Sequence, residues 1–146
     1  MEQQPRNTWL ITGAALSAIA AVMHLACLYF GAPLFRFLGT EAMAQMYESG
    51  NYAQPIIACV VLASILLTWS AYALSGAGVI RKLPLLRLAL ICITGVYLAR
   101  ALFFPLIMPY FPENSMLFWL TSSGVVFVFG AVHLIGFKKM LSRKIQ

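Results

Sequence analysis

The sequence predicts an all-α fold, an antiparallel four-helix transmembrane bundle with a short interfacial helix in its first extracytoplasmic loop. Two observations predict it. The 146-residue chain is 62% hydrophobic and only 10% charged, and it contains four apolar runs long enough to cross a bilayer. A soluble domain has about 25% charged residues and roughly 45–50% apolar ones. The composition therefore excludes a soluble globular domain, a disordered tail, a collagen-like fibre and a disulfide-stapled secreted module.

The expected membrane spans are about residues 9–30, 55–80, 84–104 and 116–137 of a single domain that covers residues 1–146. A helix rises 1.5 Å per residue, so a hydrocarbon core of about 30 Å needs about 20 residues. These runs must be helical because hydrocarbon offers no partner for backbone N–H and C=O groups. The first run exceeds the apolar stretch of about 7–15 residues in a signal peptide, so we expect it to remain as a span.

The basic residues predict the orientation of these spans. Eight of the ten lie before the first run, around the turn between the second and third, or after the fourth. Arg36 and Arg100 lie on the other side with Glu41, Glu48 and Glu113. The positive-inside rule then places both termini in the cytoplasm. The net charge of +6 does not indicate a nucleic-acid partner, because the basic residues do not gather on one surface between aromatics. The eight are Arg6, Arg81, Lys82, Arg87, Lys138, Lys139, Arg143 and Lys144.

The first connection, residues 31–54, is long and apolar in its first half. Its second half, residues 41–49, predicts a short helix opened by Thr40 and closed by Gly50. An apolar, partly helical loop beside four spans is expected to lie in the membrane interface. It then either covers the outer end of the bundle as a packing element or forms a lid over a site.

The other two connections are short. The basic turn at residues 81–84 predicts that the second and third helices are antiparallel neighbours. Three prolines in residues 105–115 end the third helix, and Asn114 or Ser115 is expected to cap the fourth. Small residues at helical spacing predict close helix packing or, alternatively, a face for a homo-oligomer or a membrane partner. They are Gly13, Ser17, Ala21, Gly76, Gly78, Gly95, Ala99, Gly124 and Gly130.

Ionisable groups at membrane depth are costly, so each is a candidate functional residue. Arg100 lies about 7 Å below the outer end of its predicted helix, and His24 lies about 9 Å below the outer end of the first. The two are therefore expected at similar depth, where Arg100 either snorkels outward or contacts an anion or headgroup. Thr121, Ser122 and Ser123 could contribute from the fourth run. The candidate ligand-binding residues are His24, Glu48, Gln54, Tyr97 and Arg100, although such groups can also simply lock a bundle together.

Other chemistries have little support in the sequence. His133 is expected roughly 20 Å in depth from His24, so the two should not share a metal, and we expect no metal site and no cofactor. Cys27, Cys59 and Cys92 form no CxxC pair. Cys27 and Cys59 both fall near the outer end, where a disulfide is an alternative to free thiols. Phosphate-binding and hydrolase motifs are absent. The sequence therefore leaves catalysis open and favours a protein that is not an enzyme.

Residues 72–87, YALSGAGVIRKLPLLR, followed by Tyr97-Leu98-Ala99-Arg100, resemble small uncharacterised four-span proteins of the bacterial inner membrane. In size and span count the chain is also loosely similar to DoxX-like membrane proteins. The resemblance implies a multi-pass protein of the bacterial inner (cytoplasmic) membrane. It implies no activity.

The expected function is binding of a small amphiphile, lipid or quinone-like molecule from the bilayer in a polar pocket of the outer half. An accessory or structural subunit of a larger membrane complex is the first alternative. A small transporter, or an enzyme that acts on a lipid-soluble substrate with His24 as acid or base, is the second.

Overall fold

The computed structural model describes residues 6–142, and every regular element in that range is helical. Arg143 and Lys144, which are among the basic residues that predict the orientation, lie outside the described residues. The helices, in chain order, are α1 (Thr8–Phe30), α2 (Ala32–Phe37), α3 (Glu41–Glu48), α4 (Ala53–Gly76), α5 (Leu86–Leu102), α6 (Phe104–Ile107), the 3₁₀ helix η1 (Met108–Tyr110) and α7 (Met116–Ser142).

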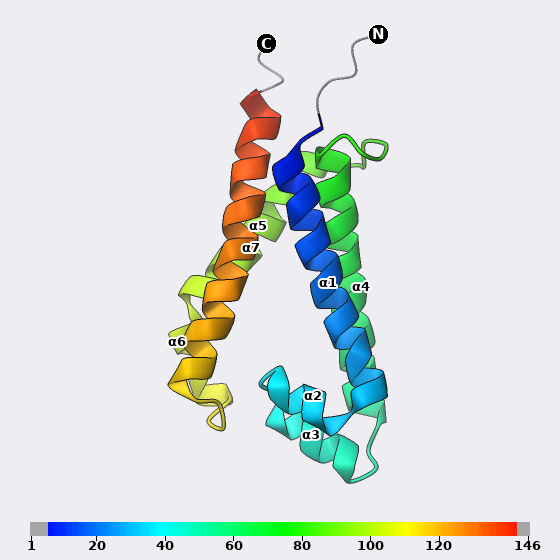
Figure 1. Ribbon diagram of the computed structural model, residues 1–146, viewed down its shortest axis with the longest axis vertical. Helices are drawn as coiled ribbons and strands as arrows, with labels where there is room; N and C mark the ends of the chain where they lie inside the picture. The colour runs from blue at the N-terminus through cyan, green and yellow to red at the C-terminus, as the bar shows by residue number, and fades with distance from the viewer. Residues whose placement is uncertain (1–5, 143–146) are drawn as a thin grey trace.

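The long helices form two antiparallel pairs, α1 with α4 and α5 with α7 (Figure 1). The pairs meet at the end of the molecule where the chain termini lie and diverge toward the other end. Helices α1, α4 and α7 are apolar and long enough to cross a membrane. Helix α5 becomes a fourth candidate when it is taken together with α6 and η1, to which it is bent by 72°. The predicted all-helical fold is thus confirmed, with three or four helices able to span a bilayer.

The helix ends differ from the predicted spans for local reasons. The second span was expected to reach residue 80, but α4 ends at Gly76 because the chain turns there and Gly78 adopts φ +77°. Helix α5 has only 17 residues, or about 25 Å, and ends before Pro105. Helix α7 continues beyond residue 137 to Ser142. Ser115 caps α7 through its Oγ, which accepts from the Phe118 N–H. The Asn114 side chain instead donates to the Gly39 carbonyl.

Asn7 ties three helices together at the terminus end. The side-chain oxygen of Asn7 caps α1 by accepting from the Leu10 N–H. The backbone N–H of Asn7 donates to the carbonyl of Ala77, the residue that follows α4. Its side-chain amide donates to the Gly136 carbonyl of α7 at 2.7 Å. Asn7 is only 2% exposed, so these bonds satisfy a polar group that burial would otherwise penalise.

Glycines let α1 and α7 approach closely. A Cβ added at Gly13 would lie 2.8 Å from the His133 ring, and one added at Gly136 would lie 3.0 Å from the Leu10 backbone nitrogen. The predicted close packing at Gly13, Ser17 and Ala21 is confirmed, since all three are buried. The expected contacts at Gly95 and Gly124 are wrong for the described residues, because a Cβ added at either meets no described atom within 4 Å.

A polar and aromatic cluster fills the junction between the pairs. The Tyr97 and Ser17 hydroxyls are 2.8 Å apart, and the Ser70 hydroxyl donates to the Ala14 carbonyl. The Tyr97 ring contacts Trp69, Phe129 and His133. The His133 Nδ1–H donates to the Phe129 carbonyl, while its buried Nε2 has no partner among the described residues. These contacts join all four long helices.

The first connection forms a helical hairpin, α2 with α3, at the end where the pairs diverge (Figure 1). Helix α3 confirms the predicted short helix, while α2 was not expected. Thr40 begins α3 without capping it, because its hydroxyl donates back to the Phe35 carbonyl. The hairpin packs on α1 and α4 through a small buried cluster of Cys27, Ala32, Phe35, Ala44 and Cys59. Both cysteines are free and buried.

Candidate ligand site between the helix pairs

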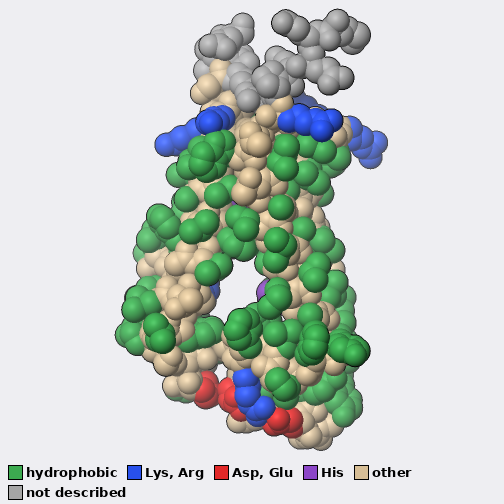
Figure 2. Space-filling view, viewed as in Figure 1, with side chains coloured by type: hydrophobic (Ala, Val, Ile, Leu, Met, Phe, Trp, Pro, Cys, Tyr) green, Lys and Arg blue, Asp and Glu red, His purple; other side chains and the backbone are tan. Residues whose placement is uncertain are grey.

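An opening passes through the molecule between the two helix pairs (Figure 2). A basic side chain lies at its edge on the α5–α7 side and a histidine at its edge on the α1–α4 side. His133 is fully buried, which leaves His24 as the histidine that reaches the surface. Arg87, Lys138 and Lys139 lie near the terminus end of α5 and α7, which leaves Arg100 as the basic residue at this level.

Arg100 has no carboxylate partner among the described residues. Its guanidinium donates to the Ser123 hydroxyl at 3.2 Å and lies over the Trp119 ring, 5.2 Å from the centroid. Both partners belong to α7, so the side chain folds across the second helix pair. A neutral hydroxyl and an aromatic face leave most of the five guanidinium N–H donors free. The cation is therefore uncompensated by any opposite charge in the described part of the chain.

Trp119 adds a second donor without an acceptor. The residue is 2% exposed, and its indole N–H has no hydrogen-bond partner within residues 6–142. Phe104, Phe111 and Phe118 surround its ring and fix its position. The Trp119 N–H is buried, so the free donors on the α5–α7 side of the opening are those of Arg100, which favour a group that carries accepting oxygens.

His24 faces the opening from α1 with one free nitrogen. Its Nδ1 lies 2.8 Å from the Ala20 carbonyl, and a carbonyl can only accept, so Nδ1 carries the proton. The other ring nitrogen, Nε2, makes no hydrogen bond to a described residue. No described hydrogen bond joins His24 to another ionisable group.

His24 and Arg100 lie on the same side of the junction. The Ser17–Tyr97 contact sets a common level for α1 and α5. His24 is seven residues farther along α1, about 10 Å. Arg100 is three residues beyond Tyr97 along α5, about 4.5 Å. Its side chain reaches Ser123 of α7, which lies about 15 Å from His133 along that helix. The expected similarity in depth therefore agrees with the helix registers.

The α2–α3 hairpin bridges the two pairs beyond the opening. Its Gly39 carbonyl accepts from the Asn114 side-chain amide at 2.8 Å, across the gap to the start of α7. Gly39 has φ +80°, and a Cβ there would overlap the Phe118 ring. Only glycine fits both requirements without strain. The hairpin thus closes one end of the opening, which remains open at its sides (Figure 2).

An ion-pair network holds the hairpin in shape. Arg36 of α2 binds Glu41 at 2.9 Å and Glu48 at 2.8 Å, both on α3. Hydrogen bonds from Arg36 lower the pKa of both carboxyls below the ordinary value, and the carboxylates raise the pKa of the guanidinium. A depressed carboxyl pKa contributes stability that is present at neutral pH and lost as the pH falls through the folded-state pKa.

We expect the hairpin to loosen in acid. A spin label at exposed position 42 of α3, in a chain in which Cys92 is replaced by serine, should be immobile at pH 7 and gain mobility below about pH 4.5. Arg36→Gln should be equally mobile at both pH values. Immobility of the Arg36→Gln label at pH 7 would show that the ion pairs do not hold the hairpin.

The predicted site residues are divided among four places. His24 and Arg100 flank the opening, whereas Tyr97 is buried in the junction against Ser17. Glu48 binds Arg36 on the hairpin surface, and Gln54 is exposed at the start of α4. No described hydrogen bond joins Glu48, Gln54 or Tyr97 to Arg100.

The structure adds residues that sequence reasoning did not single out. Trp119 was missed, although its spacing of four residues from Ser123 places both on one face of a helix. Asn114 was expected as a cap and is instead the bridge to Gly39. Of the candidates on the fourth run, Ser123 contacts Arg100. Within residues 6–142 no three His, Cys, Asp or Glu side chains are grouped to hold a metal ion.

Comparisons with protein-family models, curated proteins and solved structures give no match to this chain.

Proposed function

We propose that this chain is a membrane protein that binds a small amphiphile, such as a lipid or quinone-like molecule, between its two helix pairs. Arg100 would bind an anionic or carbonyl oxygen of the ligand, and His24 would donate or accept a hydrogen bond on the opposite side. The observation that carries the proposal is an opening with an unpaired guanidinium on one side and a free imidazole nitrogen on the other.

The proposed topology has four spans and both termini in the cytoplasm of a bacterium, with the protein in the inner membrane. Its support is the separation of charge along the molecule. Basic side chains gather near the terminus end, while Glu41 and Glu48 lie with Arg36 at the opposite end (Figure 2). Basic residues are enriched on the cytoplasmic side of membrane proteins. The opening then lies in the outer half of the bilayer.

The direction of access supports an amphiphile rather than a water-soluble ligand. The hairpin closes the outer end of the opening, and the polar junction closes the inner end. Its sides would face lipid, as do exposed apolar residues of every long helix, including Val22, Leu67, Ile91 and Val125. A ligand would therefore enter sideways from the bilayer and place its polar group between Arg100 and His24.

A second candidate role is that of a subunit that packs against a membrane partner or another copy. Gly95 of α5 and Gly124 of α7 favour it, because neither glycine packs against a described atom within 4 Å. Small residues that face outward allow another helix to approach closely. This role predicts a stable partner in mild detergent, and a monomer that keeps its bound ligand would contradict it.

The ligand position can be tested with Trp119 as reporter. In a chain with Trp9 and Trp69 replaced by phenylalanine, 2-bromododecanoic acid should quench Trp119 fluorescence saturably, because its bromine is next to the carboxylate that Arg100 would bind. Excess dodecanoic acid should restore the signal. A matched chain that keeps Trp69 as its only tryptophan should be quenched much less, because Trp69 packs against Tyr97 in the junction. Equal, non-saturable quenching of both would contradict the proposal.

A further inference from the structure

A second groove lies at the opposite end of the molecule, in the turn between α4 and α5. Its volume is about 730 Å³, and no residue of the outer opening contributes to it. Two basic residues and five apolar residues line it: Lys82, Leu83, Pro84, Leu85, Leu86, Arg87 and Leu88. The lining therefore combines two cations with a largely hydrocarbon surface.

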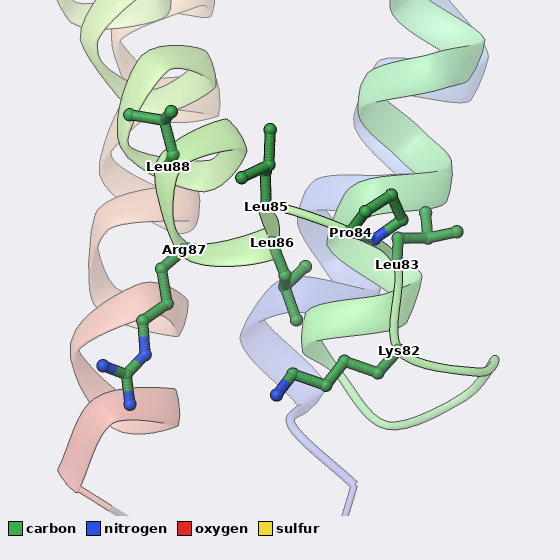
Figure 3. Close-up of a pocket in the computed structure, with 7 residues that line it drawn as sticks. All are labelled: Lys82, Leu83, Pro84, Leu85, Leu86, Arg87 and Leu88. Carbon is green, nitrogen blue, oxygen red and sulfur yellow. The ribbon is translucent and has the colours of Figure 1, made fainter.

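Two of the leucines in this groove point away from its two cations, whereas Leu86 points toward the end at which the cations lie (Figure 3). Lys82 and Arg87 extend together toward one end, while Leu85 and Leu88 extend the other way, in the direction in which α5 continues. Such an arrangement separates a charged layer from an apolar layer along the helix axis. A phospholipid at a membrane surface has the same order, with its phosphate outside and its acyl chains inside.

The two cations have no ion pair within the described residues, where salt bridges occur only at Arg36. Three of the four acidic residues, Glu41, Glu48 and Glu113, lie on the outer connections. The groove is therefore complementary to an anion.

Leu85 exposes an apolar side chain in the groove. It is the one described non-glycine residue with positive φ, at +54°, and its side chain is 74% exposed. Leu88 is also 56% exposed. The exposed leucines offer contacts that the acyl chains of a lipid can use and a free inorganic anion cannot.

We infer that this groove binds one anionic phospholipid of the leaflet that the terminus end faces. Lys82 and Arg87 contact its phosphate, and Leu85 and Leu88 contact its acyl chains. The inference does not depend on the ligand proposed for the outer opening, because the two sites share no residue.

The test uses the full chain in mild detergent with equal amounts of phosphatidylglycerol and phosphatidylcholine of identical acyl chains, followed by native mass spectrometry. The native sequence should retain phosphatidylglycerol preferentially. Lys82→Gln with Arg87→Gln should reduce that preference by roughly tenfold or more, given the attraction of each basic group to anionic lipid. Lys138→Gln with Lys139→Gln removes the same charge outside the groove and should keep most of the preference.

Further variants separate the alternatives. Leu85→Ser with Leu88→Ser should weaken lipid retention, and millimolar inorganic phosphate should not displace the lipid. The inference would be overturned if the Lys82/Arg87 and the Lys138/Lys139 double variants lost the preference for phosphatidylglycerol equally, because only the overall charge of the protein would then matter. Displacement by phosphate without any effect of the leucine variant would instead identify a site for a free anion. Arg100→Leu should leave the preference for phosphatidylglycerol intact. A result against this groove is therefore distinct from a result against the ligand site at Arg100.

Discussion

Replacement of Arg100 by leucine should weaken binding of dodecanoic acid and of decylubiquinone roughly 30-fold. A hydrogen bond to a charged group contributes about 1.5–3 kcal/mol, and about 2 kcal/mol corresponds to this loss. Arg100→Lys keeps the charge but loses the planar fork of donors, so it should retain binding of the carboxylate better than that of the quinone. Affinities can be measured by native mass spectrometry across a ligand titration.

The stability of the ligand-free Arg100→Leu chain separates a binding role from a structural one. Arg100 contacts only a hydroxyl and an aromatic ring, so its replacement leaves no opposite charge unpaired. Removal of an uncompensated charge at membrane depth should leave the thermal stability unchanged or raised. Lys138→Leu, at the far end of α7, is the matched control and should affect neither property. A large fall in stability with unchanged affinity would mean that Arg100 only holds the fold.

Gly136→Val should separate the two helix pairs. A Cβ at Gly136 already lies 2.7 Å from Leu10 Cγ and 3.0 Å from the Leu10 backbone nitrogen, which cannot move without shifting α1. The Gly136 carbonyl also accepts the bond from Asn7. Overpacking of this kind costs about 1–3 kcal/mol, and contact with the backbone places the change at the upper end. We expect the midpoint of thermal unfolding in detergent to fall by roughly 10 °C.

Gly124→Val provides the control on the same helix. A Cβ at Gly124 meets no described atom within 4 Å, so the same substitution should change the unfolding midpoint little. Equal destabilisation by both substitutions would indicate that valine disturbs α7 itself. Equal tolerance of both would show that the α1–α7 contact is not the joint between the pairs.

The helices and the charge asymmetry were predictable because both depend on local composition. Apolar runs of sufficient length define the spans, whereas their exact ends depend on local features such as Gly78 and Pro105. The pairing of the helices was not predictable. Helices that face lipid are apolar on all sides, so no amphipathic stripe indicates which face meets another helix. Small residues gave a partial signal, correct at Gly13 and wrong at Gly95.

The candidate site was predictable in depth but not in direction. Counting residues placed His24 and Arg100 at similar levels, whereas the rotation of each helix decided which neighbours they meet. That rotation buries Tyr97 in the junction, one turn from Arg100, against Ser17 of α1. The bridge from Asn114 to Gly39 joins residues 75 positions apart, and no local pattern encodes such a contact.

An experimental density map of the full chain in lipid nanodiscs tests the central claim most directly. We expect non-protein density between the helix pairs, with a polar group within hydrogen-bond distance of both Arg100 and His24. Collapse of the two pairs onto each other with no space between them would contradict it. So would an Arg100 side chain that extends past the lipid headgroups into water.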